Sequence, residues 1–256
     1  MIIGFIGSGN MAAAMARGWA SSGKGPSQML FTDSGSGRAT ALATEVGGKA
    51  VDTNEDLVDG ADFVVLAMKP KGLDEVAGSM PAPRAVMSLL GGTDVEAIVT
   101  RFPDSTVLRL MPNLAVETGR GVIAVARPDE SDSQIVSDGL ALLAPLGTVV
   151  ELDDGLMDAA TAVMGCSPAY LAVVADALAK AGVDDGLDPE DSLNMVAEAL
   201  AGTAELLKRR TPFEIQVAVA SPGGSTEAGL EALAAGGGAE AFEAAAQASL
   251  SRMREG

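Results

Sequence analysis

A glycine-rich turn directly after the first apolar run constrains this chain more than any other feature. The run Ile2 to Ile6 reads as a short buried strand, and Met11 to Ser22 has the apolar spacing of a helix. Between them lies Gly7-Ser8-Gly9-Asn10-Met11-Ala12, a G-x-G-x-x-A pattern. The first glycine allows a tight turn, the second lets backbone amides approach a pyrophosphate, and the small third residue lets helix and strand pack closely. The turn therefore predicts a dinucleotide-binding unit.

The predicted secondary structure changes part-way along the chain, from alternating strands and helices to helices alone. Further apolar runs, read as strands and separated by helices such as 38–46, cover residues 29–32, 63–68, 85–90, 106–110, 122–125 and 147–152. Strands that are apolar on both faces predict a parallel sheet covered on both sides. From Leu156 onward helices dominate, with N-cap and proline pairs at Asp188-Pro189 and Thr211-Pro212 and a helix stop expected at Gly182. We therefore expect an α/β fold, with a Rossmann-type domain over residues 1–153 and an all-α domain over residues 154–256.

Composition excludes several kinds of site. Hydrophobic residues make up 48% of the chain and charged residues 20%, which is a core-forming composition. Because the chain has no His and a single Cys, Cys166, we expect no histidine-dependent catalysis, no disulfide and no metal site. The net charge of −18 argues against nucleic acid and anionic membranes as partners. No run of about 18 apolar residues and no basic signal region is present, so we expect a cytoplasmic protein. Asp153-Asp154 reads as a solvated helix cap.

The end of the second strand bears on the choice of cofactor. Asp33 stands near the position at which an acid binds the ribose 2′-hydroxyl, which favours NADH. The loop that follows also carries Ser34, Ser36 and Arg38, which suit the 2′-phosphate of NADPH. The sequence leaves NADPH and NADH both open.

A second loop, Ser221-Pro222-Gly223-Gly224-Ser225-Thr226, leads into a helix. The free amides of Gly224, Ser225 and Thr226 would converge there with the Ser and Thr hydroxyls. Such a nest suits a small anion such as a carboxylate. An ordinary helix cap with a flexible lead-in has the same sequence signal.

Together these motifs resemble those of the pyrroline-5-carboxylate reductase family, over nearly the whole chain. The opening GFIGSGNMAAAMARG is similar to the start of that family. Ala67-Met68-Lys69-Pro70 resembles its A-V-K-P, and Met111-Pro112-Asn113 resembles its M-P-N-T-P. Ser167-Pro168-Ala169-Tyr170 and the stretch from Val219 to Thr226, VASPGGST, resemble its later signatures.

The resemblance implies an N-terminal Rossmann domain, a helical dimerisation domain and assembly into homodimers or rings of dimers. It implies reduction of the cyclic imine of 1-pyrroline-5-carboxylate to L-proline with NAD(P)H. The cofactor residues it implies, with Asp33 added from the strand argument, are Gly7, Ser8, Gly9, Asn10, Met11, Asp33, Asn54, Ala67, Met68 and Lys69. For the substrate it implies Gly223, Gly224, Ser225 and Thr226, with Ser221 and Thr226 as catalytic residues.

Imine reduction suits a chain without histidine, because a protonated C=N bond is already electrophilic. Holding two reactants in register then supplies much of the catalysis. Thr226 would hydrogen-bond the ring nitrogen, and Ser221 with the Gly224 and Ser225 amides would fix the carboxylate. Lys69 would face the cofactor, or it is a loop lysine in solvent.

Three segments depart from the family pattern and leave other functions open. Met164-Gly165-Cys166 replaces Ser-Gly-Ser, Leu114-Ala115 replaces Thr-Pro, and Phe213 to Val217 replaces a stretch with a Lys and an Asp. These changes bear on the substrate. A reductase of another cyclic imine or of a ketone, and a dinucleotide-sensing protein without catalysis, are therefore the alternative hypotheses.

Overall fold

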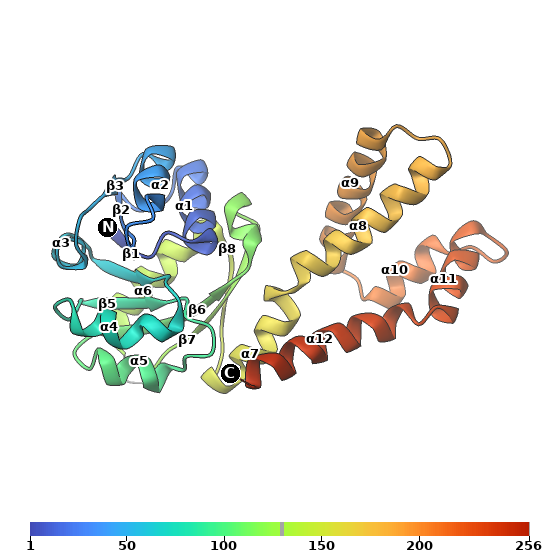
Figure 1. Cartoon of the computed structure of the whole chain (residues 1–256). Coiled ribbons are helices and arrows are strands. Elements are labelled where there is room, and N and C mark those ends of the chain that lie inside the picture. Colours follow the sequence, from blue (N-terminus) through green and yellow to red (C-terminus); the bar gives the residue numbers. More distant parts are fainter. Residues whose placement is uncertain (129–130, 256) are drawn as a thin grey trace. The chain divides into compact units, whose positions relative to one another are not determined.

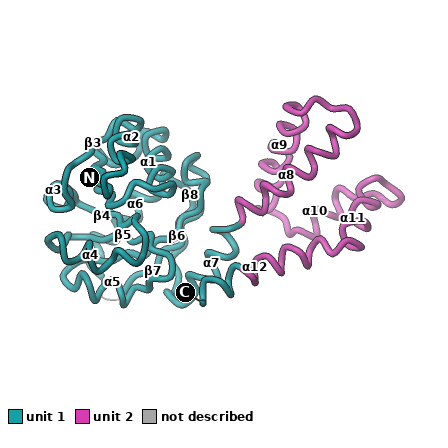
Figure 2. Tube along the Cα trace, in the orientation of Figure 1, with its two compact units in different colours: residues 1–166, 249–256 teal, residues 167–248 magenta. Residues whose placement is uncertain are grey.

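The structure, a computed structural model, describes residues 1–128 and 131–255. Contacts within the chain divide it into two compact units (Figure 2). Unit 1 comprises Met1–Cys166 with the residues from Ser249 onward, and unit 2 comprises Ser167–Ala248. This division lies later in the chain than the domain boundary expected at residue 153, which stays a prediction.

Unit 1 contains one eight-stranded sheet with the strand order β3-β2-β1-β4-β5-β6-β7-β8 (Figure 1). Its strands are β1 (Ile2–Ile6), β2 (Gln28–Thr32), β3 (Lys49–Ala50), β4 (Phe63–Leu66), β5 (Ala85–Ser88), β6 (Thr106–Pro112), β7 (Gly121–Ala126) and β8 (Gly147–Glu151). Its helices are α1 (Asn10–Ser22), α2 (Arg38–Val46), α3 (Asn54–Gly60), α4 (Leu73–Gly78), α5 (Val95–Arg101), α6 (Ser133–Leu143) and α7 (Met157–Ala160). The strand order reverses between β1 and β4, which is the switch point of a Rossmann sheet.

Alternate residues of the strands feed two separate cores, one on each face of the sheet. On one face, Phe5 and Val65 pack with residues of α1, α2 and α6. On the other, Ile6 and Leu66 pack with residues of α3, α4 and α5. Phe5 anchors the first core, since its ring stacks on Phe31 with 5.3 Å between ring centroids. The predicted sheet with both faces covered is confirmed.

One strand pair departs from the parallel arrangement expected for the sheet. β6 and β7 are antiparallel, while all the other neighbouring strands are parallel. Only residues 113–120 connect the two, and they form a short 3-10 turn at Leu114–Thr118. A parallel crossover needs a dozen or more residues. The short connection therefore reverses the chain direction.

Unit 2 is helical, and its helix starts follow the sequence closely. The helices are α8 (Ser167–Asp184), α9 (Pro189–Leu207), α10 (Pro212–Val219), α11 (Ser225–Ala235) and α12 (Gly238–Arg254), whose last residues belong to unit 1. Asp188 caps α9, and Thr211 with Glu214 forms a capping box on α10. Gly182, in contrast, lies inside α8, where a Cβ would collide with the Ser192 hydroxyl of α9. It permits close helix packing and does not end the helix.

Among the described residues, one helical stretch is long and apolar enough to cross a membrane by length and composition alone. It covers Asp154–Asp184, and only 11% of its apolar window is buried. It contains no uninterrupted run of about 18 apolar residues, so the sequence did not predict it. Exposed apolar helices also occur where a second protein chain covers them.

Gly18 offers a test of the packing that places α1. A Cβ at this position would collide with the carbonyl oxygen of Val116, in the turn that packs against α1. Alanine normally stabilises a helix interior by up to about 1 kcal/mol relative to glycine. Here we expect Gly18→Ala to lower the free energy of unfolding by about 1–3 kcal/mol, because the backbone must shift.

Gly78→Ala is the matched control, since nothing lies within 4 Å of a Cβ there. Urea unfolding of both variants measures the two effects. A Gly18→Ala protein as stable as the control would show that α1 does not approach the turn this closely.

Candidate functional site

The turn after β1 passes against the main chain of the loop after β4. Gly7 has φ +96°, and a Cβ there would lie 2.8 Å from the carbonyl carbon of Ala67 and the amide nitrogen of Met68. Glycine is therefore required at this position both by space and by backbone conformation. The approach brings two of the predicted cofactor segments together at the carboxyl ends of neighbouring strands. Ligands bind at this edge of open α/β sheets.

The N-terminus of α1 lies directly beyond this turn and is open. Gly9 precedes the helix, no side chain caps it, and nothing lies within 4 Å of a Cβ built at Gly9. The amides of Asn10, Met11 and Ala12 have no partner within the helix, because the first intrahelical bond runs from Ala13 to Gly9. Free amides and the positive end of the helix dipole fit a pyrophosphate.

A chain of hydrogen bonds behind this turn fixes Asn54. The Gly7 amide and the Ser8 hydroxyl donate to the carbonyl oxygen of Thr32, at 3.1 and 3.2 Å. The Thr32 hydroxyl donates to the side-chain oxygen of Asn54 at 2.8 Å. The Asn54 oxygen is thereby occupied, and its NH₂ group can donate to a ligand. Ser8 is buried, so its hydroxyl supports the turn and does not face the open edge.

The loop after β4 contributes Ala67, Met68 and Lys69. The Ala67 amide donates to the carbonyl oxygen of Ile6 at 2.9 Å, which extends the pairing of β1 and β4 by one bond. Lys69 is exposed, and its ammonium makes no ion pair within the described chain. This lysine is thus available to an anionic ligand at the same edge.

Asp33 lies at the end of β2, where the sequence placed it, but its carboxylate is engaged by its own loop. One oxygen accepts from the amides of Gly35 and Ser36, at 2.7 and 3.0 Å. The other accepts from the Ser36 hydroxyl at 2.9 Å and from the Ala39 amide at 2.7 Å. A carboxylate has about four lone-pair sites, so these four bonds leave none for a ribose hydroxyl.

These bonds, the one from the Ala39 amide foremost, lower the pKa of the Asp33 carboxyl from its ordinary value. Asp33 is therefore ionised at neutral pH. Because its pKa is lower in the folded protein, the stability this gives is complete above the unfolded-state pKa. It is lost as pH falls through the folded-state value.

The loop Ser221–Gly224 leads into α11 in unit 2. Gly223 has φ +71°, and the Gly224 amide donates to the carbonyl oxygen of Ser221 at 2.9 Å. The amides of Ser225 and Thr226 have no partner within the helix, whose first bond runs from Ala228 to Gly224. The Ser225 and Thr226 amides are thus free of helical partners, as the predicted nest requires. The Gly224 amide, expected to be free, is instead bonded to Ser221, which corrects that part of the prediction; the anion nest itself stays a prediction.

Glu227 was not among the sequence-based candidates, although it belongs to this loop. Its carboxylate accepts a hydrogen bond from the Gly223 amide at 2.7 Å. The bond ties the first turn of α11 to the glycine with the left-handed conformation. A Glu at the third helical position is the sequence signal of such a cap, and it was overlooked because no Ser or Thr occupies the N-cap.

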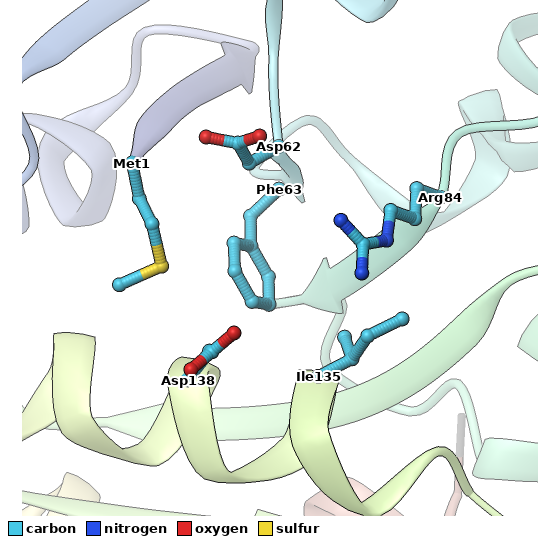
Figure 3. Close-up of a pocket in the computed structure, with 6 residues that line it drawn as sticks. All are labelled: Met1, Asp62, Phe63, Arg84, Ile135 and Asp138. Carbon is cyan, nitrogen blue, oxygen red and sulfur yellow. The ribbon is translucent and has the colours of Figure 1, made fainter.

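One surface pocket of unit 1 lies away from these loops. Figure 3 shows it at the amino ends of β1, β4 and β5, opposite the edge that carries the predicted cofactor residues. It is lined by Met1, Asp62, Phe63, Arg84, Ile135 and Asp138. Among the described residues there is also no cluster of three or more His, Cys, Asp or Glu placed to hold a metal. The candidate residues therefore lie in two loop systems, each described within its own unit.

Comparisons with known proteins decide the family. Residues 154–256 match the family model for pyrroline-5-carboxylate reductase dimerisation, and residues 2–91 match that for NADP oxidoreductase, coenzyme F420-dependent. A pyrroline-5-carboxylate reductase from Thermus thermophilus is 35% identical over 100% of this chain and 98% of its own length. One from Synechocystis is 32% identical, over 99% of this chain and 97% of its own length. The chain belongs to the pyrroline-5-carboxylate reductase family.

Solved structures agree with this assignment. The structure of 1-pyrroline-5-carboxylate reductase from Streptococcus pyogenes has a TM-score of 0.89 and 27% sequence identity, over 100% of this chain and 98% of that one. The family and the fold class expected from the sequence are confirmed. The roles of individual residues in this family member stay predictions.

The role of Asp33 can be tested with the two cofactors. If the Asp33 carboxylate stabilises its own loop and does not bind the ribose, Asp33→Asn should weaken binding of NADH and NADPH by similar factors. Titration of nicotinamide fluorescence measures both dissociation constants. Asp59→Asn is the matched control, because Asp59 is exposed and its carboxylate makes no hydrogen bond or ion pair within the described chain. Weaker NADH binding together with tighter NADPH binding would show instead that Asp33 selects the 2′-hydroxyl.

Proposed function

We propose that this chain reduces 1-pyrroline-5-carboxylate to L-proline with a hydride from NAD(P)H. The observation that carries the proposal is the presence of an amide-lined anion site in each unit of a chain that matches reductases of that name over nearly their whole length. At the level of the family, these relatives confirm the predicted reductase activity, enzyme class and NAD(P)H cofactor. The residue roles below are our own assignments.

The cofactor half is built on unit 1. The open amides of α1 and the turn at Gly7–Gly9 bind the pyrophosphate, and Asn54 donates from its NH₂ group to the neighbouring ribose. Met11 lies in the first turn of α1, beside the pyrophosphate turn, and Ala67, Met68 and Lys69 flank the cofactor on the β4 side. Either reduced cofactor suits this half, because the saturated Asp33 does not select a 2′-hydroxyl. The exposed Arg38 in the same loop can pair with a 2′-phosphate.

The substrate half is built on the start of α11. The Ser225 and Thr226 amides and the Ser221 hydroxyl bind the carboxylate, and Gly223 and Gly224 give the loop its shape. Thr226 accepts a hydrogen bond from the protonated ring nitrogen and so favours the electrophilic iminium. A reduced nicotinamide bound to unit 1 would supply the hydride to the imine carbon, and because the nitrogen is already protonated no further proton would be needed. Thr226 therefore holds the ring nitrogen, and Ser221 orients the substrate through its carboxylate.

We further propose that the chain works as a homodimer. Of the described residues in unit 2, only Ala179 and Ser192 are buried. Large apolar side chains are exposed on its helices, among them Val173 (66%), Met195 (58%), Phe213 (72%), Val219 (61%) and Leu233 (62%). A helical unit with so little core is stable when another surface covers these side chains. The match to a dimerisation family supports a second copy as that surface.

A cytoplasmic location follows from the proposed reaction, because a reductase of an amino-acid precursor needs the cell's reduced nicotinamide pool. The single Cys166 is compatible with that reducing compartment. The exposed apolar side chains of α8, within this apolar stretch, then face the partner subunit and not a lipid bilayer.

The activity is tested by supplying pyrroline-5-carboxylate with each reduced cofactor and following nicotinamide absorbance. We expect turnover on this imine. For Thr226→Val, which keeps the shape and removes the hydroxyl, we expect kcat to fall by about 10- to 1000-fold, as for loss of a transition-state hydrogen bond. Thr226→Ser, which keeps the hydroxyl, is the matched control.

Each other outcome would change the conclusion. Full activity of Thr226→Val would remove Thr226 from the chemistry. Turnover only on other imines or on a ketone would favour the related reductase, and cofactor binding without turnover on any of them would favour a dinucleotide sensor.

The dimer makes a separate prediction. Light scattering at micromolar concentration should give a mass of at least twice the 25.7 kDa of one chain. The thermal midpoint should also rise with protein concentration, since association stabilises the folded state. A stable monomer of concentration-independent midpoint would contradict the dimer.

A further inference from the structure

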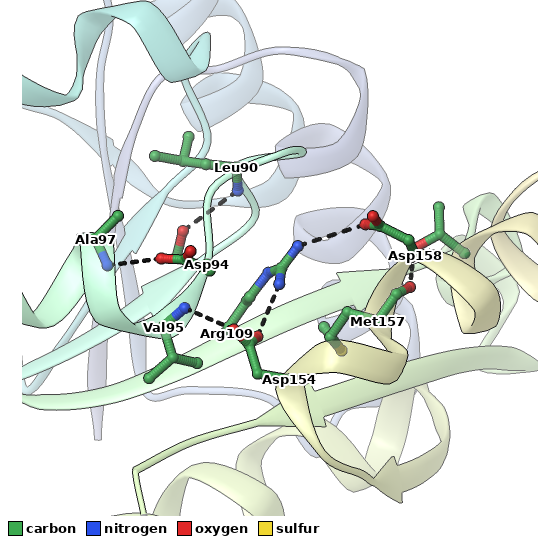
Figure 4. A network of polar contacts seen from close by, with 10 residues as sticks. Leu90, Asp94, Val95, Ala97, Arg109, Asp154, Met157 and Asp158 are labelled. Carbon is green, nitrogen blue, oxygen red and sulfur yellow. Dashed lines mark hydrogen bonds and ion pairs between the residues drawn. The ribbon is translucent and has the colours of Figure 1, made fainter. Parts of the chain in front are cut away.

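A buried arginine in β6 has no place in the mechanism so far. Arg109 is 4% exposed, and its Nη1 lies 2.7 Å from a carboxylate oxygen of Asp154 (Figure 4). Its Nη2 lies 3.9 Å from a carboxylate oxygen of Asp158. Both acids belong to the stretch after β8, so Asp154 is not the solvated cap that the sequence suggested. The buried guanidinium ties the middle of the sheet to this stretch.

The other oxygen of Asp154 extends the network to a third element. It accepts a hydrogen bond from the Val95 amide at the start of α5, at 3.0 Å. Asp154 thereby joins β6 to the N-terminus of α5, and Figure 4 shows these groups around the Arg109 side chain. The position of Asp154 is thus set from two sides.

A second polar side chain of β6 holds the far end of the same stretch. The NH₂ group of Asn113 donates to the carbonyl oxygen of Met164 at 3.1 Å, and its oxygen accepts from the Val122 amide at 3.1 Å. Asn113 directly follows β6 and is buried. The stretch 154–166, called the joint segment here, is therefore fixed to β6 near both of its ends.

Between these two attachments the joint segment contains a π-helical turn. It spans Thr161–Gly165, and the Cys166 amide donates to the carbonyl oxygen of Thr161 at 3.1 Å. Such turns are rare and are frequently found at functional sites. Because β6 is parallel to β5, β4 and β1, Asn113 and the turn attached to it lie at the ligand-binding edge of the sheet.

The place of the turn along that edge bears on the reaction. The predicted adenosine end of the cofactor lies at β2, where Asp33 stands, and the pyrophosphate lies at β1. A dinucleotide that crosses the switch point therefore extends its nicotinamide end toward β4, β5 and β6. The π-turn is on that side.

Stability alone is a poor explanation for burying Arg109. A buried ion pair loses hydration on both partners, and apolar replacements of similar volume are often equally stable. Arg109 also carries a buried Nε without a hydrogen-bond partner in the described structure, which adds to this cost. A charged clamp does offer a fixed geometry, because the planar guanidinium reaches two carboxylates at once.

We propose that Arg109 is a positioning residue for the reduction. Acting through Asp154 and Asp158, it sets the π-turn of the joint segment against the nicotinamide end of the cofactor site. Removing it leaves cofactor binding intact, because the pyrophosphate and ribose contacts lie on β1, β2 and α3. It displaces the π-turn and lowers the rate of hydride transfer. The inference rests on the proposed function for its kinetic readout.

The test compares Arg109→Met with Arg101→Met. Arg101 makes an ion pair of 2.6 Å with Asp74 on the surface of the same unit, so it controls for loss of an arginine and an ion pair. For Arg109→Met we expect kcat to fall roughly 100-fold, as for a misplacement of about 1 Å. The dissociation constant of the reduced cofactor, from nicotinamide fluorescence, should be unchanged. Arg101→Met should leave both values unchanged.

Graded variants separate positioning from folding. Arg109→Lys keeps the positive charge but loses the planar guanidinium. Its kcat should lie between those of the wild type and Arg109→Met. Asp154→Asn should lower kcat more than Asp158→Asn, because the Asp154 carboxylate lies closer to the guanidinium. The double variant Arg109→Met/Asp154→Leu removes the buried charges together and is expected to fold if Arg109→Met does not. It should still have low kcat.

Hydrogen–deuterium exchange gives a readout that needs no turnover. In Arg109→Met or the double variant, the amides of residues 161–166 should exchange faster, while those of residues 7–12 should not. Full activity of the double variant, unchanged exchange in the π-turn, or a cofactor affinity that falls in step with kcat would each overturn the inference. A wild type that binds cofactor without reducing the imine would instead overturn the proposed function, and the exchange result would still decide the role of Arg109.

Discussion

The close approach of two main-chain segments at Gly7 determines where unit 1 can bind a ligand. With β1 and β4 paired and the strand order reversing between them, the turn after β1 has room only for a residue without Cβ. Because the turn is tight, α1 starts at once and its unpaired amides face the switch point. The same turn places the Gly7 amide and the Ser8 hydroxyl on Thr32, which in turn orients Asn54. Backbone geometry, not side-chain charge, therefore builds the predicted cofactor edge.

Anion sites built from backbone amides matter in a chain with 35 acidic and 17 basic residues. An acidic protein that binds an anionic dinucleotide and a carboxylate substrate has few cations to use. Helix N-termini supply positive potential without them. The carboxylates of Asp33 and Glu227 accept hydrogen bonds from amides of their own loops, which partly offset the negative charge and fix the shape of each loop.

The sequence predicted those features that depend on neighbouring residues. The glycine turn, the Asp188 and Thr211 caps and the strands apolar on both faces are local patterns, and the structure has them. It did not predict contacts between distant segments. Gly182 reads as a helix stop because its partner, Ser192, lies on another helix. Arg109 and Asp154 are far apart in sequence, and no periodic pattern links them. Asp33 could bind a ribose or stabilise its own loop, and only the hydrogen-bond donors around its carboxylate decide between the two.

The joint segment shows why sequence and contact boundaries need not coincide in such a chain. The dimerisation family model begins at residue 154, whereas the compact helical unit begins at Ser167. The residues between them fall within the dimerisation family model and pack with the sheet. Arg109 and Asn113, both from the β6 region, account for that packing, since each bonds to the segment near one of its ends. Because the segment belongs to the helical half by sequence match and to the sheet by contact, its position depends on these polar contacts. Polar contacts suit this role better than an apolar patch, because a hydrogen bond or a guanidinium–carboxylate pair is lost on a shift that dispersion contacts would tolerate.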